Sequence, residues 1–558
     1  MSRPADFAHN RSRARSGGFV HRGALMTWFS LPPVEAGQKA AFHDSRSASA
    51  WLAAQPQANA PAMITESQTQ LAVFNTCRVP PDERFKTLTV LRPALFAISG
   101  ECQRRYENKP LPLLPAEKAL QESVRALWRA CAISYLHCLR ACLEGDMSIS
   151  PHAAKVAHRA LCCLRMEQLS CHLGGVSPDG EFWRTLHAVL VSAETLGVAR
   201  DLVEDRLLGE TKESTASGQY SMALLLELAR PFSLSRTQLA SVTRWLARWR
   251  EQARVLVEPD TGPKACCVAL DLSLDRPFHD HLRAPRLARW LSVGPVLRKI
   301  SQRTEALAAG ESPESLKLGT ALSADACADL LSELGEHLRV PPVIVEVSVE
   351  SSSVEVACGW ENLYGVVGGT GLQEASVRPS SFGNQLSQAQ LALFGHVVRH
   401  EEKVARTETW RVIKRQNDEI LLRRPAGAGS ARLSLRNLLI VRTDADSPPS
   451  LALVSALSMS DDGGLSVTAR LFAGEPQPLL MEIREKVNGA VSRHPALMLP
   501  MADGMDSASL FFPSGLAARA ASSRFLETGA NSPLSIRLDR VIERGGDHER
   551  WRLAHGSA

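Results

Sequence analysis

The pattern of hydrophobic and polar positions divides this chain into a helical part and a strand-rich part. From about residue 40 to residue 335, apolar residues recur every three or four positions, as on one face of an α-helix. Beyond Glu336 the period changes to two, which is typical of strands with one buried face. The sequence therefore predicts a multidomain α plus β protein. Residues 40–335 form an N-terminal helical bundle or irregular α-solenoid, residues 336–480 an antiparallel β-barrel, and residues 481–558 a β-rich C-terminal extension.

The clearest helix is predicted over residues 115–143, where apolar residues step by alternating threes and fours and Gly145 provides a stop. A second helix is predicted from Ser150, an N-cap followed by proline, to Gly174. A third is predicted between residues 178 and 197, and a fourth over residues 235–256. The continuous apolar run over residues 266–272 predicts a buried strand within this region.

In the strand-rich part, apolar residues alternate with polar ones in several short segments separated by turn residues. This arrangement favours a small closed barrel. The predicted strands cover residues 343–349, 354–358, 410–413, 420–423, 433–442, 451–459 and 465–472, with a final hairpin over residues 536–542 and 548–553. A helix is predicted near residues 385–396.

The net charge of +5 comes mostly from one end of the chain. Residues 1–25 contain five arginines and one acid, Asp6, which leaves 59 basic and 58 acidic residues from Met26 onward. Residues 1–25 have no hydrophobic periodicity and are predicted to be a disordered basic extension; an arm for polyanions is the alternative. Because the remainder is nearly neutral, nucleic acid is not an expected partner.

Twelve cysteines lie inside helical or strand-like apolar patterns, which predicts buried free thiols and a cytoplasmic protein. No apolar run reaches the length of a membrane span. Two pairs, Cys138 with Cys142 and His158 with Cys162, have the spacing of metal ligands on one helix face. Since Cys131, Cys138 and Cys142 continue an apolar stripe, no metal is predicted, and a Cys/His metal-binding protein remains an alternative.

No motif in the chain assembles an active site. The glycine-rich sequence at residues 365–371, GVVGGTG, lacks the Gly-Lys-Ser/Thr of a P-loop and is predicted to be a turn. His400 with Glu401, and His548 with Glu549, are isolated pairs in polar surroundings. We therefore expect a protein without catalytic residues or a cofactor.

The strands at residues 410–413 and 420–424, followed by residues 435–442 and 466–472, resemble the PilZ-type barrel of bacterial cyclic di-GMP receptors. The similarity is to large proteobacterial proteins that join an N-terminal helical region to a divergent PilZ-like barrel. It extends to residues 104–113 and to residues 538–544. The resemblance implies a cytoplasmic signalling protein with cyclic di-GMP as its ligand.

The PilZ family binds this dianion through an Arg-x-x-x-Arg arm and a turn of the form Asp/Asn-x-Ser-x-x-Gly. The turn after Trp410 places Lys414, Gln416 and Glu419 at the three turn positions, which departs from the pattern. In the arm, Arg339 precedes the barrel, and Arg399 and Lys403 stand four residues apart. The ligand-binding residues predicted by this resemblance are Arg339, Arg399, Lys403, Lys414, Arg415 and Gln416.

Two functions remain open at this point. The barrel either binds cyclic di-GMP as a PilZ-like receptor, or is a degenerate relative that acts as a signalling adaptor through protein partners. A protein-interaction scaffold that binds no nucleotide is the further alternative. For Lys414, Arg415 and Glu419, the competing interpretation is a solvated charged hairpin tip.

Overall fold

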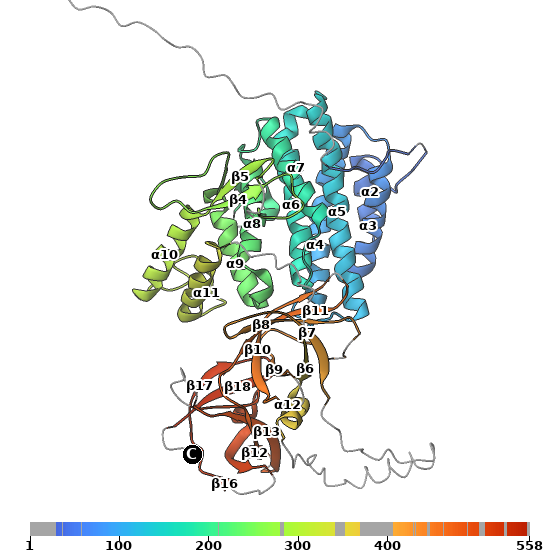
Figure 1. The fold of residues 1–558 in the computed structure, drawn as a ribbon. Coiled ribbons are helices and arrows are strands. Elements are labelled where there is room, and N and C mark those ends of the chain that lie inside the picture. The colour runs from blue at the N-terminus through green and yellow to red at the C-terminus, as the bar shows by residue number, and fades with distance from the viewer. Residues whose placement is uncertain are drawn as a thin grey trace, which may run out of the picture.

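The computed structural model describes residues 29–340, 352–368, 406–501, 508–528 and 533–554. Within these ranges, residues 36, 57–58, 210, 280–283, 428, 430, 444–446, 461 and 488 are not described. The described chain forms a helical body, a closed barrel below it and a second sheet below the barrel (Figure 1). The predicted fold class is confirmed. The predicted strand at residues 343–349 and helix at residues 385–396 lie outside the described residues.

Long helices packed side by side build the helical body (Figure 1). The longest, α5, spans Pro115–Glu144 and packs against α3, α4 and α6. It ends where predicted, because Gly145 adopts a left-handed conformation with φ of 85°. The helices of the body are α2 (Ser45–Ala54), α3 (Ala60–Thr76), α4 (Pro81–Tyr106), α5, α6 (Ala153–Leu173), α7 (Gly180–Thr195), α8 (Ala216–Leu228), α9 (Arg236–Trp249), α10 (Gly294–Ala308) and α11 (Ala324–His337).

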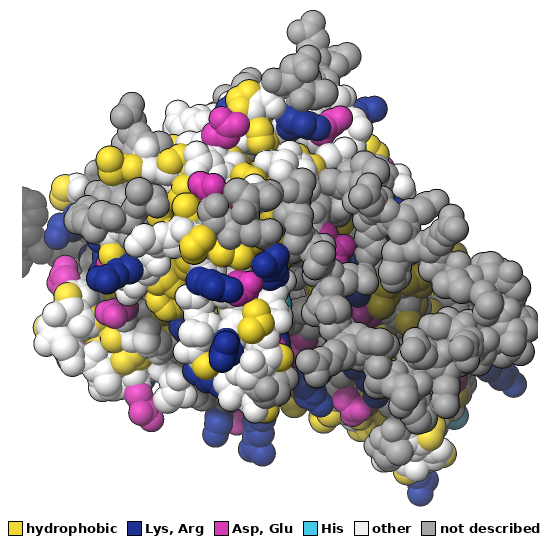
Figure 2. Space-filling model, turned by 90° about the horizontal axis from the view of Figure 1, so that it is seen from below, with side chains coloured by type: hydrophobic (Ala, Val, Ile, Leu, Met, Phe, Trp, Pro, Cys, Tyr) yellow, Lys and Arg dark blue, Asp and Glu magenta, His cyan; other side chains and the backbone are white. Residues whose placement is uncertain are grey.

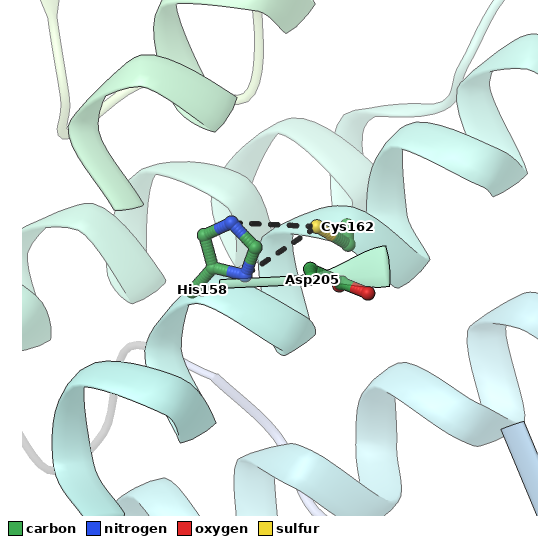
Figure 3. A group of neighbouring side chains, drawn as sticks. All are labelled: His158, Cys162 and Asp205. Carbon is green, nitrogen blue, oxygen red and sulfur yellow. Dashed lines mark hydrogen bonds between the residues drawn. The ribbon is translucent and has the colours of Figure 1, made fainter. Parts of the chain in front are cut away.

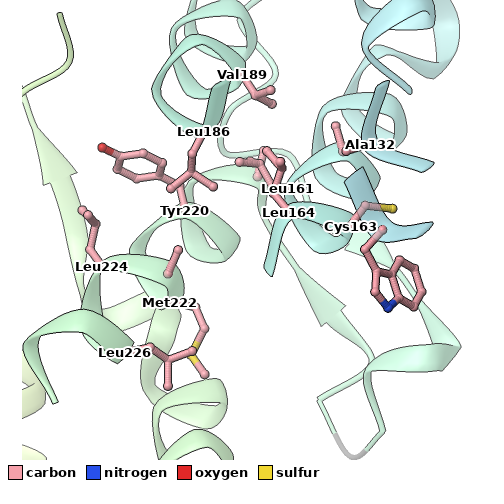
Figure 4. Packing of buried hydrophobic residues seen from close by; sticks show 14 of the residues in the cluster. Ala132, Leu161, Cys163, Leu164, Leu186, Val189, Tyr220, Met222, Leu224 and Leu226 are labelled. Atoms are coloured by element: carbon pink, nitrogen blue, oxygen red, sulfur yellow. The ribbon is translucent and has the colours of Figure 1, made fainter. Parts of the chain in front are cut away.

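The core of this body includes cysteines as small apolar residues. Cys163 is fully buried in the same cluster as Ala132 and Leu164 (Figure 4). Its Sγ lies 3.4 Å from the Sγ of Cys131 on the neighbouring helix α5. Burial raises the pKa of Cys138 to about 12 and that of Cys142 to about 11, so both are neutral thiols. The prediction of mostly buried free thiols is confirmed for the described cysteines.

The helical body also contains short strands and 3-10 turns. The strand predicted at residues 266–272 is β4 (Cys267–Asp271), which pairs with β5 (Ala288–Ser292), while β5 also pairs with β3 (Arg254–Leu256). The helix predicted over residues 235–256 is therefore too long, because α9 ends at Trp249 and the chain continues into β3. The remaining short elements are η1 (Ser150–His152), β1 (Val203–Glu204), η2 (Arg206–Leu208), β2 (Glu213–Ser214), η3 (Pro231–Ser233) and η4 (Arg250–Gln252).

Six antiparallel strands close into a barrel in the order β10-β11-β8-β7-β6-β9. Alternate residues point inward and form one apolar core, in which Trp410, Leu422 and Val467 are fully buried. The strand predicted to start at residue 433 starts later, because residues 433–437 contact the helical body or turn toward β10. The strands are β6 (Ser353–Cys358), β7 (Glu408–Gln416), β8 (Glu419–Arg424), β9 (Leu438–Arg442), β10 (Ser450–Met459) and β11 (Leu465–Leu471).

The remaining strands form a seven-stranded sheet in the order β16-β15-β12-β13-β14-β18-β17. Leu480 and Phe511 from this sheet pack against Ile440 of the barrel, so the two β units share a core. The first two residues of the glycine-rich segment, 365 and 366, are the last residues of α12 (Trp360–Val366). Its residues 369–371 are not described. The elements of the sheet are β12 (Gln477–Glu485), β13 (Val491–Leu499), β14 (Ser509–Pro513), α14 (Leu516–Arg519), β15 (Ala520–Glu527), β16 (Pro533–Leu534), β17 (Leu538–Arg544) and β18 (His548–Leu553).

Candidate functional site

The ligand-binding residues predicted from the sequence lie on two parts of the fold. Arg339 follows α11 in the helical body, is exposed, and acts electrostatically on the thiol of Cys266. Lys414, Arg415 and Gln416 are exposed at the end of β7. Among the described residues, no hydrogen bond or ion pair joins Arg339 to this hairpin. Arg399 and Lys403 lie outside the described residues.

The hairpin of β7 and β8 is tight. Gln416 pairs with Glu419, and Asn417 adopts a positive φ of 53° between them, as a two-residue turn requires. The side chains of Lys414, Arg415 and Glu419 all face solvent. This geometry agrees with a solvated charged tip, and the binding role of these residues stays a prediction.

A second set of residues has the spacing that the PilZ-type arm and turn require, and the sequence analysis did not identify it. Arg432 and Arg436 stand four residues apart directly before β9. Ser458, Ser460 and Gly463 occupy the end of β10 and the turn that follows it, so two of the three turn positions match and Ser458 replaces the Asp/Asn. Both spacings are visible in the sequence and could have been found by testing every barrel turn.

Arg424 on β8 lies between the start of this arm and this turn. The Nη1 of Arg424 donates to the carbonyl oxygen of Ala431, next to Arg432, at 2.6 Å. Beside it, a Cβ at Gly464 would collide with the carbonyl oxygen of Arg424, so the turn requires glycine there. Gly463 itself has φ of 80°. The Oγ of Ser460 is buried and has no hydrogen-bond partner among the described residues.

Arg432 joins the barrel to the helical body. Its Nε donates to the carbonyl oxygens of Pro110 and Pro112, each at 3.0 Å, and its Nη2 lies 2.7 Å from the carboxylate of Glu117 on α5. Arg436 is half exposed and pairs with Glu543 at 2.7 Å. Arg432 is therefore positioned at the junction with the helical body and Arg436 at a contact with the C-terminal sheet, and each already has a carboxylate partner.

The junction also has an apolar and a backbone component. Leu111, in the loop between α4 and α5, exchanges two backbone hydrogen bonds with Leu433, both of 2.7 Å. Its side chain belongs to the barrel core. On the other side, the N–H of Met459 donates to the carbonyl oxygen of Gly175 at 2.6 Å, so the turn after β10 contacts the end of α6. The two halves are thus held together next to the candidate site.

A cavity of about 180 Å³ lies in the same junction. The helical body contributes His172, Phe232 and Arg236, and the barrel contributes Leu435 and Leu457. The Nε2 of His172 lies 2.8 Å from the carboxylate of Glu227 and must donate to it, since a carboxylate only accepts. The Nδ1 of His172 is buried without a hydrogen-bond partner among the described residues.

His158, Cys162 and Asp205 form the one group of three potential metal ligands found in the described part of the chain (Figure 3). All three are buried, and their ligand atoms lie within 4.8 Å of one another. Burial lowers the pKa of His158 to about 3 and raises that of Cys162 to about 11. For Asp205, burial alone would raise the pKa, but the hydrogen bond with Arg92, the charge of Arg92 and the N–H of Leu207 together outweigh burial and lower it.

Two of these residues already have polar partners. The Nη2 of Arg92 lies 2.5 Å from the Oδ2 of Asp205, with both side chains buried, and the Nε2 of His158 lies 2.7 Å from the Oγ of Ser214. The cation beside Asp205 is therefore Arg92, and a divalent ion at this place would be repelled by it. We interpret the group as a buried polar network, and the expectation of no bound metal stays a prediction.

The face seen from below carries basic and acidic side chains that are interspersed (Figure 2). In the C-terminal sheet, Glu482 pairs with both Arg493 and Arg524, and Glu485 pairs with Arg519. These cations are compensated by neighbouring acids. No helix of the described residues has the length and apolar character needed to span a bilayer.

Residues 46–260 match the sequence model of a family described as cyclic-di-GMP receptor FimW, N-terminal domain. The match covers less than half of the chain, from α2 to the end of β3, and stops before the barrel. Residues 46–260 of the helical body are therefore similar to the N-terminal domain of a cyclic di-GMP receptor. No curated protein matches the chain. The PilZ resemblance of the barrel stays a prediction.

Proposed function

We propose that this protein is a non-catalytic cyclic di-GMP receptor that binds its ligand at the junction between the helical body and the barrel. One observation carries the proposal. Arg432 and the end of β10 both contact the part of the helical body that is similar to a cyclic di-GMP receptor domain, and Arg436 follows Arg432 in the same loop.

The chemistry of each group suits the ligand. Cyclic di-GMP carries two phosphates, and arginine binds phosphate through two parallel N–H groups and stacks on a planar base. The hydroxyl of Ser460 has no partner to lose, and the adjacent glycines let a ligand approach the backbone closely. Each charge-assisted hydrogen bond contributes about 1.5–3 kcal/mol.

Isothermal titration of the full chain with cyclic di-GMP tests the proposal. We expect micromolar binding by the wild type and at least tenfold weaker binding by Arg436→Ala. Arg436 is the better choice because its side chain is half exposed and its loss leaves the contacts of Arg432 with the helical body in place. The absence of heat at high micromolar ligand would refute the receptor function.

The ligand-binding residues predicted from the sequence provide a second set of variants for this experiment. Lys414→Ala, Arg415→Ala and Gln416→Ala, combined in one variant, remove the charged hairpin end, and Arg339→Ala removes the remaining described cation of that set. Loss of binding in either variant, with Arg436→Ala unchanged, would place the ligand at the hairpin or at Arg339 instead. Retained binding in both supports the junction.

A second candidate function follows from the contacts of Arg432. The helical body already provides Arg432 with two carbonyl oxygens and one carboxylate, so its guanidinium group has hydrogen-bond partners without a ligand. This observation favours an adaptor or scaffold that acts through protein partners and binds no nucleotide. The titration separates the two functions, since the scaffold predicts no heat.

A further inference from the structure

We infer that the junction cavity receives one guanine base of cyclic di-GMP, so that the helical body completes the binding site and reads the base. This inference rests on the proposed function and adds residues that lie outside the barrel.

The position of the cavity supports this assignment. Leu433 and Leu435 line it and follow directly after Arg432 in the sequence. A phosphate bound by Arg432 would therefore lie near the cavity. Its volume of about 180 Å³ is below the roughly 300–1,000 Å³ of sites that hold whole drug-sized ligands. An apolar cavity of about 150 Å³ holds a benzene ring. The size thus suits one ring system, with the phosphates remaining outside.

The polar groups of the cavity complement guanine. Guanine presents O6 and N7 as acceptors, and arginine or lysine binds this edge. Lys109 and Arg236 line the cavity; Lys109 is exposed and pairs with no described residue, and Arg236 is held by an ion pair with Glu107. Guanine also carries N–H donors. The backbone carbonyl groups of the loops that line the cavity are acceptors of the kind that these donors need.

The same groups disfavour adenine. In place of the guanine O6, adenine carries an amino group that donates, and this donor would face the cations of Lys109 and Arg236. Phe232 supplies an aromatic surface, and its ring is fixed edge-to-face against His172 with centroids 5.7 Å apart. A base can therefore stack on an aromatic residue whose orientation is already set.

The test compares titrations of the full chain with cyclic di-GMP and with cyclic di-AMP. Lys109→Met removes one cation, and Phe232→Leu removes the aromatic surface while keeping an apolar side chain. Each variant should bind cyclic di-GMP at least about fivefold more weakly, as expected for a lost base contact or stacking surface. Lys109→Met should also reduce the ratio of the dissociation constant for cyclic di-AMP to that for cyclic di-GMP. The matched control is Lys118→Met, an exposed lysine on α5 outside the cavity, which should change binding less than about twofold.

The outcomes separate this inference from the proposed function. If the wild type binds no cyclic di-GMP, both fail. If the wild type binds, Arg436→Ala weakens binding and the two cavity variants bind like the wild type, the receptor function stands and the base pocket is refuted. Unchanged thermal melting of Lys109→Met, whose side chain is exposed, excludes unfolding as the cause of a loss.

Discussion

Glu117→Gln tests whether the helical body competes with the ligand for Arg432. In the structure the Nη2 of Arg432 lies 2.7 Å from the Oε2 of Glu117, and the two side chains are 26% and 16% exposed. The same carboxylate oxygen accepts from the backbone N–H of Leu114 at 2.8 Å. Glutamine keeps an acceptor for the N–H of Leu114, so the N-terminus of α5 is preserved. It removes the negative charge, so the interaction with Arg432 is weakened.

The expected effect is tighter ligand binding. A partly exposed ion pair contributes about 1 kcal/mol, and about 1.4 kcal/mol corresponds to a tenfold change in a dissociation constant. If Arg432 must leave Glu117 to reach a phosphate, Glu117→Gln should lower the dissociation constant for cyclic di-GMP about fivefold. Isothermal titration measures this directly.

The control is Glu122→Gln on the same helix, where the carboxylate lies 3.8 Å from Lys118 and both side chains are largely exposed. It should leave the affinity unchanged. Equal or weaker binding by Glu117→Gln would mean that Arg432 binds the ligand without leaving the helical body, or that it does not bind the ligand. Either result would refute the competition.

Four further outcomes are expected. Leu111→Ala should lower the free energy of unfolding by about 2–5 kcal/mol in urea titrations, because Leu111 fills the barrel core. Gly464→Ala should lower the melting temperature, because its Cβ would collide with the carbonyl oxygen of Arg424. Burial lowers the pKa of His158 to about 3 and of His187 to about 4. Since both stay neutral when folded and take up protons below about pH 6.5 when unfolded, the free energy of unfolding should fall from pH 7 to pH 5 by about 1–2 kcal/mol per histidine. Zinc analysis of the purified protein should give a substoichiometric content, because Arg92 occupies the place beside Asp205.

Each of these has a result that would contradict it. Leu114→Ala, at a half-exposed position of the same loop, should change the free energy of unfolding by less than about 0.5 kcal/mol. An equal loss of stability in Leu114→Ala and Leu111→Ala would refute the explanation by burial. Gly100→Ala, in open space on α4, should not destabilise. A constant free energy of unfolding between pH 7 and pH 5 would mean that the histidines titrate normally. One equivalent of zinc per chain would restore the metal-binding alternative.

Much of the fold could be predicted from local patterns. The end of α5 follows from Gly145, whose left-handed conformation is inexpensive only for glycine. The barrel strands follow from alternation of period two between turn residues, and β8, β10 and β11 lie within one or two residues of their predicted bounds. The end of α9 was missed because the apolar spacing continues through Trp249 into β3, and a helix and a strand both accommodate that spacing.

The candidate site was predictable only in part. The spacing of Arg432 and Arg436, and that of Ser460 and Gly463, is present in the sequence, but a four-residue spacing of arginines also occurs by chance in a chain with 64 basic residues. What distinguishes Arg432 is that the neighbouring Ala431 contacts Arg424, which lies beside the turn after β10 because strand pairing across the barrel places it there. The hairpin at residues 414–419 was chosen on the sequence because it is the turn after Trp410, between the first two strands that resemble the PilZ-type barrel.

The sequence by itself determined which faces of the helices and strands are apolar, where most of them end, and that the cysteines belong to cores. These properties depend on residues close together in the chain, since the period of a helix or strand is set by its own backbone geometry. Only the tertiary structure decided that Leu111 enters the barrel core and that Arg432 contacts Glu117, more than 300 positions away. An apolar face in the sequence indicates that it is buried, but it does not indicate which distant segment packs against it. For that reason the junction, its cavity and the proposed binding site emerged only from the folded chain.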